Sequence, residues 1–253
     1  ISRDHPAEHV WVNPEAAAVE RIVSLLEVPG AIDVVPFLNG HLLVAGFRIT
    51  SGSEFAGLLL PHVRLLFPTP TIVAAIQRQE EWIIPHGDEE IQEGDLIYFA
   101  VAREELGNLL SLMGSGESAT HHVMIAGASR IGLELARRLE KLDYEKVVLI
   151  EESAERARHA EEVLERTLVI CGPVTERDVL EEEDIDRIAT FVALTADHET
   201  NLVSSLLAKQ LGAQRAFALV DNPALATLIG EVGIDAVISP RLLAVGLTLQ
   251  HIH

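Results

Sequence analysis

Gly127, Ser129 and Gly132 lie in a short segment that could bind a phosphate. The apolar run Val123–Ala126 precedes them, and a helix-like stretch to Lys141 follows. A glycine turn between a strand and a helix is typical of the Rossmann fingerprint, in which free N–H groups at the helix N-terminus face a pyrophosphate. The first glycine permits a tight turn, and the last lets the helix pack close to the strand. A glycine turn that serves only helix–strand packing is the alternative interpretation.

Glu151 closes the next apolar run, Val147–Ile150, and follows Gly132 by nineteen residues (151 − 132). A carboxylate at this strand end can accept hydrogen bonds from both hydroxyls of a ribose. We expect it to make no hydrogen bond with the protein core, so that Glu151→Ala would weaken nucleotide binding without unfolding the protein. Ser129 departs from the fingerprint, because a glycine is usual there. Its side chain either narrows the gap to the phosphates or adds a hydrogen bond.

Composition excludes several classes of function. The chain of 253 residues carries a net charge of −20, which would repel nucleic acid rather than bind it. Phe55–Phe67 is among the longest apolar stretches, and Pro61, His62 and Arg64 interrupt it well before the length of a membrane span. The single cysteine, Cys171, excludes an internal disulfide and is expected to be a small buried apolar residue at the end of a strand.

The apolar pattern divides the chain into two domains. Residues 1–30 are predicted to be an entering linker helix, because Asn13-Pro14 is typical of a helix start and Pro29-Gly30 of a stop. Residues 31–113 have the period of short strands, with a hairpin at Asn39-Gly40. The small and polar residues of 114–120 indicate a flexible joint. Residues 121–253 form the second domain.

Strands and helices alternate after the joint. Strands are expected near 122–126, 146–150, 167–170, 190–194, 215–220 and 235–238, and a helix that the chain does not complete follows from Leu242. Strands that are separated by helices run parallel with right-handed crossovers. The sequence therefore predicts an α/β protein, a Rossmann-like parallel-sheet domain preceded by a small β-rich α+β domain.

Several segments resemble the RCK (KTN) family of potassium-transport regulators, in its Trk-type uptake branch. The resemblance is carried by Val123–Glu134, Glu151, Ile170–Gly172, the run Phe191–Asn201 and Gly233–Arg241, which are similar to the second nucleotide-binding domain of such regulators. Asn13–Glu15, Pro29–Ala31, Ile84–Asp88 and Glu93–Asp95 resemble the RCK-C lobe of the first repeat. The resemblance spans nearly the whole chain and implies the end of one repeat joined to the start of the next.

The resemblance implies a ligand and a set of residues that hold it. The ligand would be an adenosine nucleotide, either NAD(H) or ATP and ADP. The phosphates would lie against the glycine turn and helix start, Glu151 would bind the adenosine ribose, and the third and fourth strand ends would complete the pocket. These residues are Gly127, Ala128, Ser129, Arg130, Ile131, Gly132, Glu151, Gly172, Thr195 and Ala196. Pro173 stands where the family usually has Asp.

The function implied is regulation rather than catalysis. The chain would be part of a cytoplasmic subunit, peripheral on the cytosolic face of the membrane, that gates an integral membrane potassium-translocating subunit and assembles as a homo-oligomer, a dimer or a tetrameric ring. An RCK module of a potassium efflux or antiporter system is the first alternative. An NAD-dependent oxidoreductase is the second, and His198 is its only plausible acid–base residue near the cleft. Asp197 and Asn201 are expected to cap and pack the following helix.

Both ends of the chain are predicted to be assembly surfaces. The last helix, from Leu242 to Leu249, is apolar on most sides, and the entering helix carries an apolar stripe of Ala17, Ala18, Ile22, Val23 and Leu26. Because such surfaces are seldom left in water, we expect another subunit or another part of a longer protein to cover them.

Overall fold

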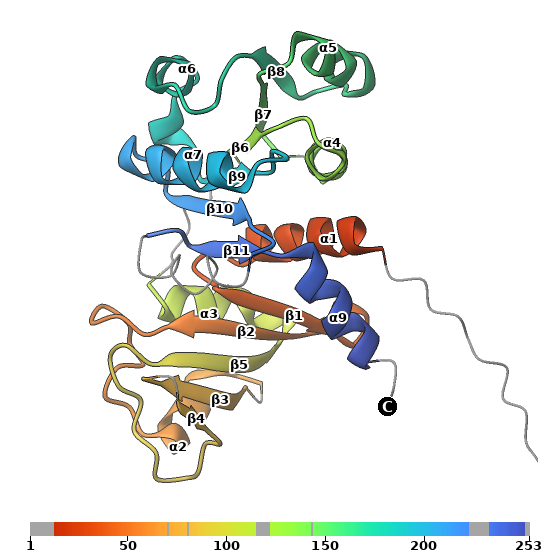
Figure 1. Ribbon diagram of the computed structural model, residues 1–253. Coiled ribbons are helices and arrows are strands. Elements are labelled where there is room, and N and C mark those ends of the chain that lie inside the picture. The colour runs from red at the N-terminus through yellow and green to blue at the C-terminus, as the bar shows by residue number, and fades with distance from the viewer. Residues whose placement is uncertain are drawn as a thin grey trace, which may run out of the picture. The chain divides into compact units, whose positions relative to one another are not determined.

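The computed structural model describes residues 13–69, 71–79, 81–114, 122–142, 144–222 and 233–250 (Figure 1). The predicted joint at 114–120 lies outside this description apart from Gly114. The chain divides into two compact units, one of residues 21–120 and the other of residues 1–20 with 121–253.

The unit of residues 21–120 is built on a five-stranded antiparallel sheet in the order β1-β2-β5-β3-β4. Its strands are β1 (Asp33–Phe37), β2 (Leu42–Arg48), β3 (Ile72–Arg78), β4 (Glu81–Ile83) and β5 (Leu96–Ala102). The unit also contains two short helices, α2 (Leu60–Val63) and α3 (Leu106–Leu112). Buried Phe47, Phe55 and Phe99 pack together in its core, with ring centroids 5.0–6.3 Å apart.

The β1–β2 hairpin differs from the predicted two-residue turn. Phe37 pairs with Leu42, so residues 38–41 form the connection, and Leu38–Gly40 is a short 3-10 helix. Leu38 and Gly40 have φ angles of 50° and 84°. Two left-handed residues flank Asn39, and the turn is therefore wider than an Asn-Gly pair alone would make it.

The second unit contains a six-stranded parallel sheet in the order β11-β10-β9-β6-β7-β8. Helices α4 and α5 lie on one side of this sheet, and α6 and α7 lie on the other (Figure 1). The strands are β6 (His122–Ala126), β7 (Lys146–Glu151), β8 (Leu168–Cys171), β9 (Thr190–Ala193), β10 (Arg215–Leu219) and β11 (Ala236–Ile238), and the helices are α4 (Arg130–Lys141), α5 (Ala154–Val163), α6 (Arg177–Glu182), α7 (His198–Gln210) and α9 (Pro240–Gln250). This is the Rossmann strand order, and it confirms the predicted fold class.

The strand order of this sheet predicts where a ligand binds. The first and fourth strands in sequence, β6 and β9, are neighbours in the sheet, and the strand order reverses between them. Ligands of open parallel sheets bind outside the carboxyl ends of the strands at such a reversal. The chain segments that follow Ala126 and Ala193 therefore form the expected site.

Helix α1 (Pro14–Glu27) begins as predicted, with the Asn13 side chain accepting a hydrogen bond from the N–H of Glu15 at 3.0 Å. Its apolar stripe is not left in water, since Ala18, Ile22, Val23 and Leu26 are all buried within the chain. The expectation that another subunit or another part of a longer protein covers these residues is therefore wrong.

Candidate functional site

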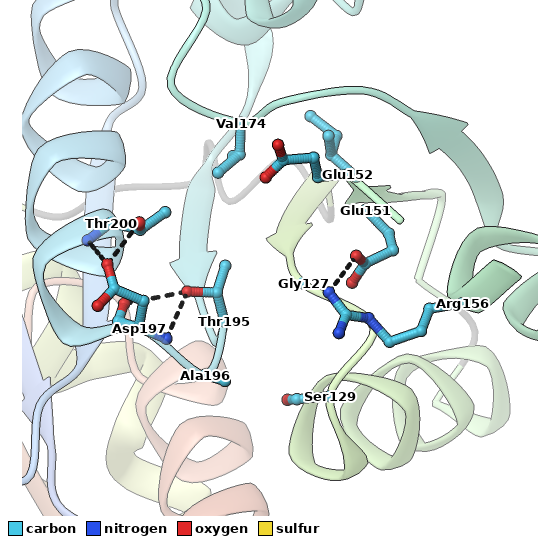
Figure 2. Close-up of a pocket in the computed structure, with 11 residues that line it drawn as sticks. Gly127, Ser129, Glu151, Glu152, Arg156, Val174, Thr195, Ala196, Asp197 and Thr200 are labelled. Carbon is cyan, nitrogen blue, oxygen red and sulfur yellow. Dashed lines mark hydrogen bonds and ion pairs between the residues drawn. The ribbon is translucent and has the colours of Figure 1, made fainter. Parts of the chain in front are cut away.

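A cavity of about 250 Å³ lies at the carboxyl ends of β6, β7 and β9. Glu151 and Arg156 lie on one side of it, and Thr195, Asp197 and Thr200 lie on the other (Figure 2). Its lining consists of Gly127, Ser129, Ile150, Glu151, Glu152, Arg156, Val174, Thr195, Ala196, Asp197 and Thr200. We call this cavity the cleft.

Two glycines allow the backbone to form the floor of the cleft. Gly127 has a φ of +101°, and a Cβ on it would lie 2.9 Å from the backbone N and Cα of Thr195. A Cβ on Gly132 would lie 2.1 Å from the carbonyl oxygen of Gly127. Both positions therefore require glycine, the first for the turn and the close approach of β9, the second for packing of α4 against the turn.

Ser129 is the N-cap of α4. Its Oγ accepts a hydrogen bond from the backbone N–H of Gly132 at 3.2 Å and faces the cleft. The hydroxyl hydrogen is still able to donate to a ligand, because a hydroxyl carries one donor besides its acceptor lone pairs. The departure from glycine thus caps the helix and leaves a donor at the predicted phosphate position.

Glu151 is buried, with its side chain 3 % exposed, and it is bound by three donors. Its Oε2 accepts from the N–H of Ala128 at 2.8 Å, and its Oε1 accepts from the N–H of Ser153 at 2.8 Å and from Nη2 of Arg156 at 2.6 Å. The expectation that this carboxylate makes no hydrogen bond with the protein is wrong. It joins the glycine turn after β6 to the start of α5.

These bonds keep Glu151 ionised. Burial acts to raise the pKa of the carboxyl, but the hydrogen bonds from Arg156, Ser153 and Ala128 outweigh burial and lower the pKa below its ordinary value. A negative charge therefore stands on the wall of the cleft at neutral pH, where hydroxyl groups are suitable partners.

The opposite wall is a hydrogen-bonded turn between β9 and α7. Asp197 is the N-cap of α7, and its Oδ2 accepts from the backbone N–H and the hydroxyl of Thr200 at 2.7 and 2.6 Å. Asn201 is fully buried, accepts from the N–H and hydroxyl of Thr195, and donates to the carbonyls of Thr195 and Leu219. The predicted capping and packing roles of Asp197 and Asn201 are confirmed.

The structure brings five of the ten predicted site residues to the lining of the cleft: Gly127, Ser129, Glu151, Thr195 and Ala196. The other five act behind it or outside it. Ala128 and Ile131 are buried, Gly132 packs under the turn, Arg130 is 85 % exposed beside Glu15, and the N–H of Gly172 donates to the carbonyl of Glu151. None of these five lines the cleft.

Sequence reasoning missed Arg156 and Glu152, which line the cleft next to Glu151. The signal for Arg156 was its position three residues after Ser153, the N-cap of α5, which places it in the first helical turn beside the strand end. Cys171 is exposed rather than buried, because β8 is an edge strand of the sheet. His198 begins α7 but does not line the cleft.

Two domain families match the chain in tandem. Residues 44–114 match the TrkA-C domain, and residues 123–240 match the TrkA-N domain. The chain belongs to the TrkA family. It is 35 % identical to the Trk system potassium uptake protein TrkA of Azorhizobium caulinodans, over 100 % of this chain and 56 % of that protein. The chain thus spans about half the length of the curated relatives it matches, and its relatives are named for potassium uptake and not as dehydrogenases.

Solved structures show the same fold. The GsuK RCK domain is 20 % identical with a TM-score of 0.60, covering 94 % of this chain and 50 % of that one. The GsuK channel bound to NAD is also 20 % identical, with a TM-score of 0.61 over 94 % of this chain and 41 % of that one. The TrkA family resemblance predicted from the sequence is confirmed. No helix within the described ranges is long and apolar enough to cross a membrane.

Proposed function

We propose that this chain binds an adenosine nucleotide, NAD(H) or ATP and ADP, in the cleft. The observation that carries the proposal is the buried, ionised Glu151 at the end of β7, opposite Thr195 and beside the capped start of α4. A carboxylate there can accept hydrogen bonds from a ribose, and the N-terminus of α4 can bind the phosphates. The GsuK channel, which shares this fold and has been solved bound to NAD, supports a dinucleotide as one candidate.

The other predicted site residues keep roles in this proposal. Gly127, Ala128, Ser129, Arg130 and Ile131 would surround the phosphates, with Gly132 packed beneath them, and Gly172, Thr195 and Ala196 would complete the site. Arg130 is largely exposed, and its only ion pair among the described residues is with Glu15 at 3.4 Å. It is therefore available to a phosphate at the helix start, where an anion would offset the charge of the guanidinium.

The nucleotide would serve regulation of potassium uptake. We infer a cytoplasmic role at the inner face of the membrane, as part of a homo-oligomeric regulator that gates an integral membrane potassium-translocating subunit. A ligand changes such an equilibrium only through its different affinity for two states. The relatives named Trk system potassium uptake proteins support this partner over an efflux or antiporter system.

A thermal-unfolding panel with NAD, NADH, ATP and ADP tests the binding step. A nucleotide at a hundred times its dissociation constant should stabilise the fold by about 2.7 kcal/mol, which is measurable as a rise in Tm. Inorganic phosphate at matched ionic strength is the control for a nonspecific anion effect. No rise in Tm with any of the four nucleotides would overturn the proposal.

A transport assay tests the regulatory step. Potassium uptake should be measured in vesicles that carry a Trk-type membrane subunit, with and without this protein and the nucleotide that stabilises it. The proposal expects the uptake rate to change only when protein and nucleotide are both present. An uptake rate that does not change when protein and nucleotide are both present would contradict the proposed membrane partner and leave the proposed nucleotide binding untouched.

A further inference from the structure

Glu151 has few acceptor positions left for a ligand. A carboxylate offers about four lone-pair sites, two on each oxygen. Within the described part of the chain, Oε1 accepts from Ser153 and from Arg156, and Oε2 accepts from Ala128. Oε1 is therefore fully used, and a single site remains on Oε2.

A ribose that carries both its 2′- and 3′-hydroxyls needs two acceptor sites on this carboxylate. One of the three donors must therefore leave before both hydroxyls can bind. Ala128 and Ser153 donate through backbone N–H groups, one in the glycine turn and the other at the N-cap of α5, so neither can withdraw without unfolding the local backbone.

Arg156 is the donor that can leave. Its side chain is 62 % exposed whereas that of Glu151 is 3 % exposed, and it reaches the carboxylate from the first turn of α5 through a flexible stem. Glu152, on the lining of the cleft, is also close enough to interact electrostatically with the guanidinium. A rotation of the Arg156 side chain frees one acceptor site on Oε1 without any change in the backbone.

We propose that Arg156 is a specificity-determining residue that competes with the nucleotide ribose for Glu151. This inference rests on the proposed function. A ligand with two ribose hydroxyls must displace the guanidinium, whereas a ligand with one hydroxyl can use the remaining site on Oε2 and leave Arg156 in place. Arg156 therefore lowers the affinity for ribonucleotides and reduces the ratio of that affinity to the affinity for deoxynucleotides.

The test compares Arg156→Gln with Arg158→Gln. Arg158 lies on the same helix, is exposed, does not line the cleft and has no ion pair or hydrogen bond with any described residue. Each variant removes one positive charge from α5, so the general electrostatic effect on an anionic ligand is matched. Dissociation constants for ADP and for 2′-deoxy-ADP should be measured by calorimetry at one ionic strength for both variants and the unmodified chain.

We expect Arg156→Gln to bind ADP up to about fivefold more tightly than the unmodified chain, because an ion pair with one exposed partner is worth up to about 1 kcal/mol. Its affinity for 2′-deoxy-ADP should change little. Arg158→Gln should bind both ligands equally well or more weakly, because the loss of a cation disfavours an anion.

Each other outcome has a distinct meaning. If the unmodified chain binds ADP and Arg156→Gln binds it equally or more weakly, the competition by Arg156 is overturned and the proposed nucleotide site stands. An equal gain for ADP and 2′-deoxy-ADP would also overturn it, because the effect would not depend on the second hydroxyl. If none of the three proteins binds ADP, the inference is overturned, and the proposed function fails with it only if NAD, NADH and ATP do not bind either.

Discussion

At the scale of single residues, Glu151 combines a proposed role in ligand binding with a role in holding the local backbone. It stands where a ribose-binding carboxylate is expected, and it also holds the glycine turn and the α5 N-terminus through buried hydrogen bonds. A substitution there cannot affect ligand binding alone.

Glu151→Ala should therefore lower both nucleotide affinity and stability. It leaves the N–H groups of Ala128 and Ser153 without their acceptor, and an unsatisfied buried donor costs about 1–3 kcal/mol. Urea unfolding should show a lower midpoint, whereas Glu152→Ala, which removes an exposed carboxylate from the next position, should change it little. Equal midpoints for Glu151→Ala and the unmodified chain would mean that these hydrogen bonds do not stabilise the fold.

The sequence predicted backbone-determined site residues better than side-chain-determined ones. Gly127 and Ser129 follow β6, Glu151 ends β7, and Thr195 follows β9, so their positions follow from strand ends alone. Arg156 lines the cleft because of its side-chain conformation, which spacing does not specify. The prediction that Cys171 is buried is wrong because its exposure depends on β8 being at the edge of the sheet, and strand order is a tertiary property.

At the scale of elements, α4 is fixed at both ends. Its first turn packs on the carbonyl of Gly127 through Gly132. In its last turn, Oε1 of Glu140 accepts from the backbone N–H groups of Glu165, Arg166 and Thr167 at 2.8–3.1 Å. The helix is thereby tied to the segment that leads into β8.

Gly132→Ala should prevent the close packing of α4 on the glycine turn. The added Cβ would lie 2.1 Å from a backbone oxygen, which is less free to move than a side chain, so we expect a loss of about 3 kcal/mol, the upper end of the range for overpacking, in the free energy of unfolding. Gly172→Ala is the matched control, since its Cβ would meet only the Val179 side chain at 3.4 Å. Chemical denaturation of both variants checks this, and similar losses would contradict the role of Gly132.

Glu140 should make stability depend on pH in the acid range. Burial acts to raise its pKa, but the hydrogen bonds from Arg166, Thr167 and Glu165 outweigh burial and lower the pKa below its ordinary value of 4.5. A lowered folded-state pKa stabilises the fold above the unfolded pKa, and this contribution is lost as the pH falls through the folded-state value.

Glu140→Gln should accordingly be less stable than the unmodified chain at neutral pH, and the difference should shrink as the pH falls below 4.5. Urea midpoints across this range measure it. Glu134→Gln, on an exposed position of the same helix, should show no such convergence. A constant difference at every pH would show that Glu140 does not contribute through its charge.

At the scale of elements the sequence was accurate, since all six predicted strands of the second unit are present within one or two residues. The alternation of buried strands and amphipathic helices determines these positions. The β1–β2 connection was less accurate, because it depends on two left-handed residues around Asn39 rather than on the Asn-Gly pair.

At the scale of the whole molecule, the net charge and the exposed apolar surface have opposite effects on self-association. The net charge of −20 disfavours association of two copies at low ionic strength. Leu242 and Val245 of α9 are 54 % and 53 % exposed, and their spacing of three residues places them on one helical face. Because the apolar stripe of α1 is buried, this face of α9 is what remains of the predicted terminal assembly surfaces.

Self-association should therefore increase with salt and depend on α9. We expect light scattering to show a dimer or larger species at high ionic strength, and the double variant Leu242→Asp with Val245→Asp to shift it toward monomer. Val203→Asp, at a position of α7 that is 54 % exposed, is the control. A monomer at every concentration and salt level would contradict an assembly role for α9.

The pairing of β6 with β9 also has a kinetic consequence. It joins residues 123–126 to residues 190–193, so the two walls of the cleft come from segments that are distant in the sequence. Because loop closure opposes the formation of such non-local contacts, we expect them to form late in folding. A nucleotide that needs both walls should therefore slow the unfolding rate and leave the refolding rate nearly unchanged, which stopped-flow measurements with and without ligand would show. Bound ligand would then prolong the lifetime of the folded state without helping the chain to reach it.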